Sequence, residues 1–439
     1  MPVDIEEVLS LASRSAEEAE VYSVQVEDTP VAFEANRLKV LQTRRTSGLS
    51  LRLIKNGRVG FTSSTKPEPA QDIVDRALAV SEFGAEAKFS LPSTGITREV
   101  SVYDPLVEGL QLEAMVDLGQ RMIDRLRAYN PHILCGADVS RYVASMELLN
   151  SRGGSAGERK TVLSASLSGN LVEGTSILDV WEGDASCRAS LDFDGIVQRV
   201  IDQFELARTT GAVPTAELPV IFVPKAVAET LVSPLIIAFS GKTVQQGASP
   251  LRGRLGERVF DERISLADDG TVDFAPRSGP SDDEGVPSRR TPLIENGVVR
   301  NFYYDLQTAG QAGAQSTGNG FRSLDSLPGP SPTNTIMAEG DTSLADMIAD
   351  VKEGLIVYQV MGAWLGNLLA GDFSANVHLG FRIENGRLAG RVKDTMVAGN
   401  VYEAFKDRLQ AVGDRAEWIG GSSNLPALYF RALSVSAKQ

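Results

Sequence analysis

The chain of 439 residues is 42% hydrophobic and 23% charged, and its 57 Asp and Glu outnumber 43 Lys and Arg to give a net charge of -14. Its length suggests about two to three globular domains. The acidic balance repels nucleic-acid phosphates and anionic membrane surfaces, so we expect no direct contact with nucleic acid or membrane. The acidic N-terminus does not resemble a secretory signal, and no apolar run approaches the roughly 18 residues of a membrane span. A cytoplasmic protein is therefore expected.

The first elements predict a small α+β unit. An amphipathic helix is expected over residues 4–20. Apolar and polar residues then alternate, as in antiparallel strands, over 21–28, 37–46 and 48–64. Within the last of these runs, Asn56-Gly57 is typical of a type I′ hairpin turn. A helix over 69–83 would cover one face of this sheet with an apolar stripe of Ile73, Val74, Ala77, Leu78 and Val80.

A second unit repeats this order. It begins with a helix over 110–129, whose apolar face consists of Leu110, Met115, Leu118, Met122 and Leu126. Strand patterns and a closing helix follow over 132–151, 160–172, 174–186 and 194–208. The repetition predicts two related subdomains, residues 1–100 and 101–210. Gly and two Pro make residues 208–219 a plausible linker.

The rest of the chain, residues 217–439, is predicted to form a larger β-rich C-terminal domain. Asn296-Gly297 and Asn385-Gly386 mark two more hairpins. A short helix is expected from its N-cap Ser343 to Gly354. Residues 305–335 are rich in Gly, Ser, Thr and Pro, and a loop of this length is usually functional or mobile. The predicted fold class is α+β, with two small helix and antiparallel-sheet subdomains before the β-rich domain.

Candidate catalytic groups are sparse. The two histidines, His132 and His378, lie in different predicted domains, so a His-based zinc site is not expected. His378 falls in a strand pattern, where a structural role is favoured. Cys135 and Cys187 lie far apart and are expected to be small buried residues. The sequence contains no nucleophile elbow and no phosphate-binding glycine loop.

One carboxylate cluster is more suggestive. Asp282, Asp283 and Glu284 precede Gly285 in a predicted turn. Such carboxylates can bind a hard cation or cap a helix. They can also pair with the neighbouring Arg289-Arg290. The sequence leaves these alternatives open.

Several motifs in order carry a family resemblance. They are "LVSPLIIAFSGKTVQQGASPLRGRLGERVFDERISLADDGT", "DDEGVPSRRTPLIENGVVRNFYYD", "STGNGFR", "PTNTIMAEGD", "VKEGLIVYQVMG" and "GDFSANVHLGFRIENGRLAGRVKDTMVAGN". This order resembles the C-terminal domain of the TldD and PmbA (TldE) family, known as modulators of DNA gyrase and as peptidase family U62. The two preceding repeats are similar to that family's first and second domains, so the resemblance covers nearly the whole chain.

The resemblance also distinguishes two kinds of subunit. TldD-like subunits carry a HExxxH helix whose histidines hold zinc, together with a cysteine near the C-terminus. The matching positions in this chain are Ser233, Pro234 and Ala238, and the C-terminal segment 417–430 contains no cysteine. The resemblance therefore implies a PmbA- or TldE-type subunit with no catalytic residue, no metal ligand and no cofactor.

For such a subunit the family implies a heterodimer with a TldD-like metallopeptidase that cuts unfolded peptides in a closed cavity. Removal of leader peptides and turnover of an antitoxin are the associated processes, so any link to DNA gyrase is indirect. A homodimer is the alternative assembly, because the surface that meets a homologous subunit can also meet a copy of itself. An extended peptide can bind such a subunit by strand addition.

Candidate residues for lining the cavity or binding peptide are Ser240, Gly241, Asp282, Asp283, Glu284, Gly285, Asn319, Arg322 and Asn334. For each of them, maintenance of a loop or turn is the simpler explanation. Two other functions stay open. One is an independent hydrolase that uses the carboxylates at 282–284 with a bound cation. The other is a homodimeric peptide-binding scaffold.

Overall fold

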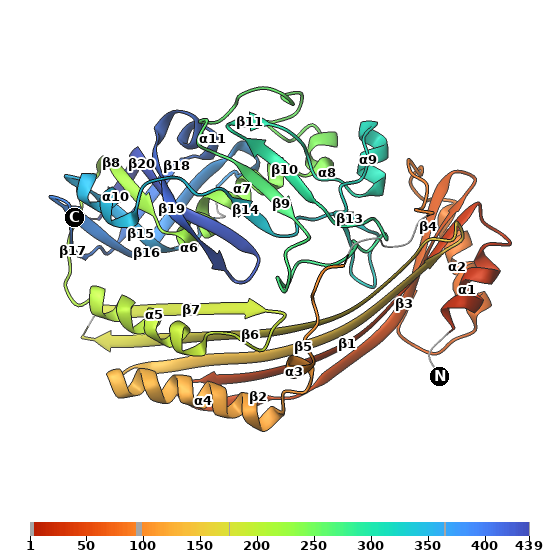
Figure 1. Ribbon diagram of the computed structural model, residues 1–439, viewed down its shortest axis with the longest axis horizontal. Helices are drawn as coiled ribbons and strands as arrows, with labels where there is room; N and C mark the ends of the chain where they lie inside the picture. The colour runs from red at the N-terminus through yellow and green to blue at the C-terminus, as the bar shows by residue number, and fades with distance from the viewer. Residues whose placement is uncertain (1–3, 94–98, 175, 364–365, 439) are drawn as a thin grey trace.

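The computed structural model describes residues 4–93, 99–174, 176–363 and 366–438. It is an α+β fold in which a long curved sheet, with its helices, lies against a larger β-rich unit (Figure 1). The predicted fold class is therefore confirmed. No helix of the described residues is long and apolar enough to cross a membrane.

The first predicted unit contains the expected hairpins and two helices. Its elements are α1 Ile5–Ala12, β1 Glu18–Glu34, β2 Arg37–Leu41, β3 Arg44–Lys55, β4 Arg58–Ser64 and α2 Ala70–Ser81. The predicted helix 4–20 was too long, because residues from Glu18 onward pair with β3 instead. The turn at Asn56-Gly57 is confirmed, with φ of 51° and 70°. In α2, Ile73, Val74 and Ala77 are buried as predicted, but Val80 is 48% exposed.

The second predicted unit contains helices and antiparallel strands, and its strands join those of the first. Its elements are α3 Pro105–Glu108, α4 Leu112–Tyr129, β5 Leu134–Asn150, β6 Ser155–Glu173, β7 Ser176–Ser186 and α5 Phe193–Leu206. Strands of both units make one seven-stranded sheet in the order β4-β3-β1-β5-β6-β7, with β2 beside β1. The junction is a long antiparallel β1–β5 pairing, from Glu20 opposite Asn150 to Phe33 opposite Ala137.

All four larger helices of this half cover one face of the sheet (Figure 1). Val21 of β1 packs in the core under α1 and α2, whereas Val31 and Phe33 pack under α4. These positions share the same parity along the strand and therefore point to the same face. The opposite face, which includes Tyr22, is left to meet the C-terminal unit.

The C-terminal unit is built on a closed ring of strands. Its elements are β8 Ala216–Phe222, α6 Pro224–Val227, π-helix η1 Ala228–Val232, α7 Ser233–Ala238, α8 Gly241–Gln245, β9 Leu266–Asp269, β10 Arg290–Glu295, β11 Val298–Val299, α9 Leu306–Ala312, β12 Gly320–Phe321, β13 Gly329–Pro330, β14 Thr335–Met337, α10 Leu344–Asp350, β15 Glu353–Met361, 3₁₀-helix η3 Leu368–Ala370, β16 Asp372–Glu384, β17 Arg387–Arg391, β18 Thr395–Asn400, α11 Val401–Glu403, π-helix η4 Ala404–Arg408, β19 Leu409–Ile419 and β20 Ser423–Ala437. Strands β20-β18-β16-β15-β8 form a barrel because β8 pairs back to β20. Phe222 lies in its core with Phe373 and Phe430, at edge-to-face centroid distances of 6.4 and 6.0 Å.

Sequence predictions for this unit hold in part. Hairpin turns at Asn296-Gly297 and Asn385-Gly386 are confirmed. Ser343 caps α10 as predicted, but the helix ends at Asp350 and not at Gly354, because β15 begins at Glu353. Residues 305–335 are not wholly a loop, since α9 and the short strands β12 and β13 lie within them.

Edge strand β7 joins the sheet to the barrel through its backbone carbonyls. The Ile177 carbonyl accepts a hydrogen bond from Arg391 at 3.4 Å, and the Asp179 carbonyl lies 2.8 Å from the His378 ring nitrogen. Trp181 accepts at its carbonyl from Gln359 at 2.8 Å and from Lys225. These alternate residues face away from β6, so side chains of the C-terminal unit cover an edge that would otherwise be open.

Candidate functional site

The helix that contains Ser233, Pro234 and Ala238, the positions that the resemblance places at a lost zinc motif, runs without a break through α6, η1 and α7. Ser233 is half-buried, while Pro234 and Ala238 are buried. A hydroxyl, a pyrrolidine ring and a methyl group do not provide the imidazole or carboxylate ligands that zinc requires. These residues do not fit a zinc ion, and no metal-dependent step is assigned to them.

The end of α7 is held by side chains from other segments. Ser249 donates its hydroxyl to the Ala238 carbonyl at 2.7 Å, and Tyr303 donates to the Ile236 carbonyl at 3.1 Å. The Ser249 bond satisfies a carbonyl group at the helix end, and the Tyr303 bond adds to the one that the Ile236 carbonyl accepts from the Phe239 amide at 3.1 Å. Burial raises the pKa of the Tyr303 hydroxyl, which keeps it protonated and able to donate. The end of α7 is thus fixed in place by side chains from other segments.

The Ser240-Gly241 turn follows directly and is also buried. Ser240 is the N-cap residue of α8, and the Gly241 amide donates to the Tyr303 carbonyl at 2.8 Å. A Cβ atom at Gly241 would lie 2.2 Å from a ring carbon of Tyr304. Close packing therefore explains the glycine without a ligand.

The carboxylate turn is closed by its own backbone and by β12. One oxygen of Asp282 accepts from the Glu284 and Val286 amides at 3.0 and 2.9 Å, and the other accepts from Gly320 at 2.8 Å. Gly285 completes the turn with a φ of 73°. Burial, followed by the nearby Glu284, raises the pKa of Asp282 well above its usual range. A cation at Asp282 would have to displace these amide bonds.

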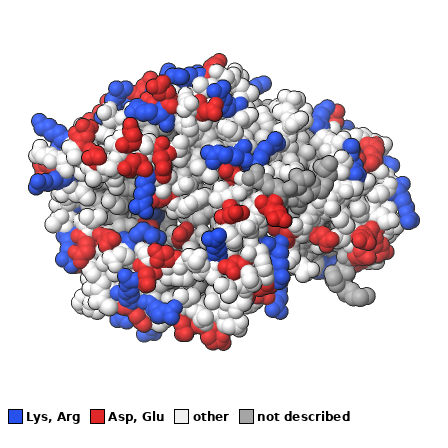
Figure 2. Space-filling view, viewed as in Figure 1, with Lys and Arg blue, Asp and Glu red and all other residues white. Residues whose placement is uncertain are grey.

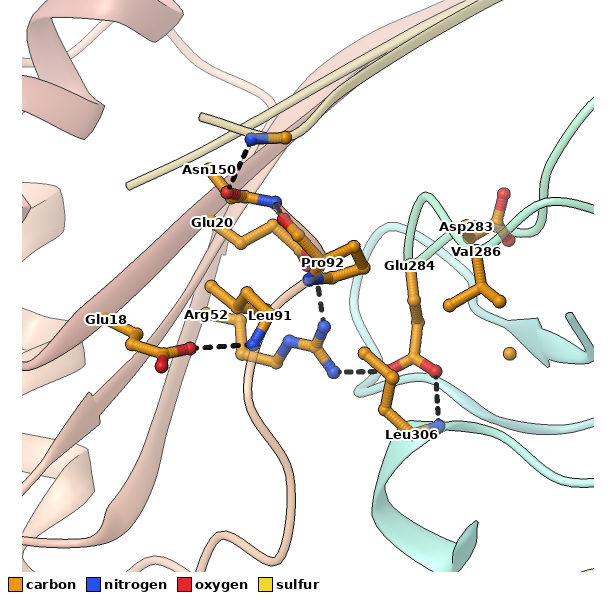
Figure 3. A network of polar contacts seen from close by, with 12 residues as sticks. Glu18, Glu20, Arg52, Leu91, Pro92, Asn150, Asp283, Glu284, Val286 and Leu306 are labelled. Atoms are coloured by element: carbon orange, nitrogen blue, oxygen red, sulfur yellow. Dashed lines mark hydrogen bonds and ion pairs between the residues drawn. The ribbon is translucent and has the colours of Figure 1, made fainter. Parts of the chain in front are cut away.

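Glu284 forms part of a buried charge network between the two halves of the chain (Figure 3). Arg52 of β3 donates to Glu284 at 2.6 Å and to Glu20 of β1 at 3.1 Å. Arg322 donates to the second oxygen of Glu20 at 2.5 Å. At most 3% of any of these four side chains is exposed, so the pairs are largely unscreened by solvent.

The glutamates respond differently to this environment. Burial opposes ionisation of Glu20, but the Arg322 and Arg52 guanidinium groups outweigh it and lower the pKa of Glu20. Burial raises the pKa of Glu284 despite the opposing charge of Arg52. The second Glu284 oxygen accepts from the Leu306 amide at 2.7 Å, which ties α9 to the same network.

Arg322 and Asp283 connect the network to the loop after α9. The Arg322 amide donates to the Asp283 carboxylate at 2.9 Å, and its guanidinium donates to the Asp283 carbonyl. The guanidinium also lies 4.6 Å from the centre of the Tyr22 ring, a cation–π contact across the same junction.

Asn319 and Asn334 bind a pair of buried aspartates at the end of β9. Asn319 donates to the Asp268 carboxylate at 2.7 Å, and Asn334 donates to the Asp269 carbonyl at 2.7 Å. Asp268 also accepts from the Thr333 amide and hydroxyl at 2.6 and 2.8 Å. Burial raises the pKa of Asp268 to about 6.

The structure thus brings most predicted residues into one buried region. Arg290 pairs with Asp269 at 3.3 Å, and no ion pair between Arg289-Arg290 and the 282–284 carboxylates is found in the described residues. Sequence reasoning missed Glu20, Arg52 and Asp268. For Arg52 a signal was available, because it is a lone charge in the apolar run Leu51 to Ile54.

A second polar cluster lies just before Ser233 on the same helix. Lys225 is 3.2 Å from the Glu182 carboxylate and 3.3 Å from the centre of the Trp181 ring. Burial lowers the pKa of Lys225 and raises that of Glu229, one helical turn later. Such shifts bring an amine and a carboxyl closer to neutral-pH acid–base chemistry.

Metal ligation is not evident in the parts of the chain that the structure describes. They contain no group of three or more His, Cys, Asp or Glu that could hold an ion. Cys135 and Cys187 are buried as predicted, and both are free. The assembled residues offer hydrogen bonds and charges at an internal junction.

Comparison with known proteins identifies the family. A family model described as the PmbA/TldA metallopeptidase C-terminal domain matches residues 215–437, more than half of the chain, and the model for domain 1 matches residues 19–81. The chain belongs to the PmbA/TldD metallopeptidase family. An uncharacterized relative in Methanocaldococcus jannaschii is 30% identical over 93% of this chain and 94% of its own length. A protein of Methanothermobacter thermautotrophicus named metalloprotease is 26% identical over 92% of this chain and 88% of its own.

The solved structures include a family member of the same shape. TldE from Thermococcus kodakarensis superposes with a TM-score of 0.90 at 25% identity, covering 98% of this chain and 99% of its own. The family resemblance that the motifs indicated is therefore confirmed.

Proposed function

We propose that this PmbA/TldD-family chain is the non-catalytic, TldE-type subunit of a two-subunit metallopeptidase that acts on unfolded peptides. The observation that supports the proposal is the helix at 233–238, where Ser233, Pro234 and Ala238 offer no imidazole or carboxylate to a metal ion. The side-chain bonds that hold the end of α7 support a structural role for this helix. Similarity to a protein named TldE agrees with this assignment.

The partner we propose is a TldD-like subunit that carries the HExxxH motif, in the cytoplasm. Substrates would be extended peptides, such as leader peptides or an antitoxin. Ser240, Gly241, the 282–285 turn, Asn319, Arg322 and Asn334 would support the cavity wall from behind, because they are buried or partly buried and hydrogen-bonded within the chain. Any link to DNA gyrase would be indirect. On the face shown in Figure 2, the drawn Lys and Arg are interspersed with Asp and Glu and form no extended basic surface.

Metal content and assembly test this proposal together. The purified chain should form a homodimer by light scattering and carry no stoichiometric metal. Addition of the TldD-like subunit from the same organism should convert it into a heterodimer, with metal contributed by that subunit. Stoichiometric metal on the chain alone, lost on replacement of Asp282 and Glu284 by Asn and Gln, would instead favour an independent hydrolase. A homodimer that does not bind the TldD-like subunit would favour a peptide-binding scaffold.

A further inference from the structure

One edge of the N-terminal sheet is open in the described residues. Strand β4 ends at Ser64, opposite Leu49, and the chain then leaves the sheet through Pro67 and Pro69, which cannot donate backbone hydrogen bonds. Arg44–Gly48 of β3 therefore pair with β1 alone, as does β2. The other outer strands differ, because β4 bridges Glu86 and β7 is covered by the barrel.

The open edge has room for another strand. Positions 44–47 are exposed, and so is most of β2. A hollow of about 380 Å³ lies beside the end of β4 and extends over β3 to β1, lined by Ser23, Val24, Gln25, Ser47, Gly48, Leu49, Ser64, Thr65, Lys66 and Pro67.

Backbone parity shows which residues face this space. The Val59 amide of β4 donates to Ala85 at 2.9 Å, so it points away from β3. Alternate residues of β4, including Ser64, therefore bond toward β3, and their partners on β3, including Leu49, bond toward β4. By the same alternation, Arg45 and Ser47 present their N–H and C=O groups to the open edge.

The open edge is basic, which favours an added strand with acidic side chains. Residues 37–48 contain Arg37, Lys39, Arg44 and Arg45 and no acidic residue, in a chain whose net charge is -14. Glu27 and Glu34 on β1 pair with Arg45 at 2.8 Å and Lys39 at 3.8 Å, and Asp28 is opposite Arg44. These acids lie on the inner strand, so an added strand would meet the basic side chains directly. A second copy of this edge would place like charges opposite each other.

We propose that the outer edge of β2 and β3, residues 37–48, is a strand-addition site for an extended peptide segment with acidic side chains. Leu38 and Leu41, 41% and 47% exposed, would contact apolar residues at alternate positions of that segment. The site belongs to the N-terminal sheet and does not depend on α7 or on a catalytic partner. It therefore goes beyond the proposed function.

Binding of a synthetic peptide to the full chain tests the site. The probe is a labelled, disordered peptide in which Glu alternates with Val, and fluorescence anisotropy reports its binding. The same peptide with alternate backbone amides N-methylated, or with Lys in place of Glu, should not bind. Ser47→Pro, which removes an outward N–H, should weaken binding by about tenfold or more, whereas Ser47→Ala should not.

Charge is tested by a matched pair of variants. Arg44→Glu should weaken binding and reduce its salt dependence, while Arg14→Glu, which makes the same change of net charge in the turn after α1, should leave binding unchanged. Absence of binding, or equal binding of the N-methylated or Lys peptide, would overturn the site. The assay needs no partner subunit, so failure of the peptide to bind would not contradict the proposed role in a metallopeptidase. That role is tested separately by metal content and assembly.

Discussion

Glu20, Arg52, Arg322 and Glu284 are charged side chains at a junction that solvent barely reaches. Such a network is costly to bury, and its main energetic signature is the penalty for removing one member. Its members come from β1, β3, the segment between β9 and β10, and the residue that follows β12, so the network fixes how the sheet meets the C-terminal unit.

Replacement of Arg52 by Met should be strongly destabilising. It leaves Glu284 buried with only the Leu306 amide, and the expected loss is about 3–5 kcal/mol of unfolding free energy. The double variant Arg52→Met/Glu284→Gln should recover part of that loss. Urea unfolding measures both, with the exposed Arg254–Glu257 pair as the control, where Arg254→Met should cost less than about 1 kcal/mol. Equal effects of Arg52→Met and Arg254→Met would show that the network does not couple the two halves.

Asp268 predicts a pH effect. Its pKa rises from 3.8 to about 6 on folding, so the native state holds a proton in this window that the unfolded chain releases. Its contribution to stability is present below about pH 4 and is lost as pH rises through 6, by at most about 1.4 kcal/mol per pH unit. Asp268→Asn removes this contribution, so unfolding free energies from pH 4 to 7 should fall less steeply than in the parent. The same slope in both proteins would mean that Asp268 titrates normally.

The sequence predicts some of these site residues but not the residues that they contact. The motifs around Asp282, Asn319, Arg322 and Asn334 stand out locally. Their partners do not, because Glu284 meets Arg52 from a distant strand and Asn319 meets Asp268 across a loop. Pairing over such separations leaves no trace in a single sequence.

At the level of elements, periodicity predicted most helices and strands but not always their ends. The apolar stripe of α2 and the Asn-Gly turns specified local geometry directly. Helix 4–20 was overextended because residues 13–17 do not break the pattern before β1 begins. The joining of both units in one sheet could not be predicted, because alternation in β1 and β5 fits many registers equally well.

The β7 edge makes a prediction at this level. His378→Ala removes the ring that meets the Asp179 carbonyl, and loss of one hydrogen bond of about 1 kcal/mol should speed amide exchange in 176–186 several-fold. Exchange in β3 should not change. His132→Ala is the matched control, because His132 is exposed in the turn between α4 and β5. Unaltered exchange in β7 would show that the barrel does not hold this edge through His378.

For the whole molecule, fold and family agree. Under the proposed function, Ser233, Pro234 and Ala238 would stand in place of the family's zinc ligands, and their helix would have only a structural role. The junction of buried charges would keep the sheet and barrel in fixed relation while another chain supplies the catalytic groups.

Cleavage of a disordered peptide tests this account most directly. The purified chain should be inactive alone, become part of an active peptidase when mixed with the TldD-like subunit of its organism, and lose that activity with a chelator. A mixture with Ser233→Ala should stay active, because Ser233 takes no part in the chemistry. Chelator-sensitive cleavage by this chain alone would contradict the account and direct attention to the carboxylates at 282–284.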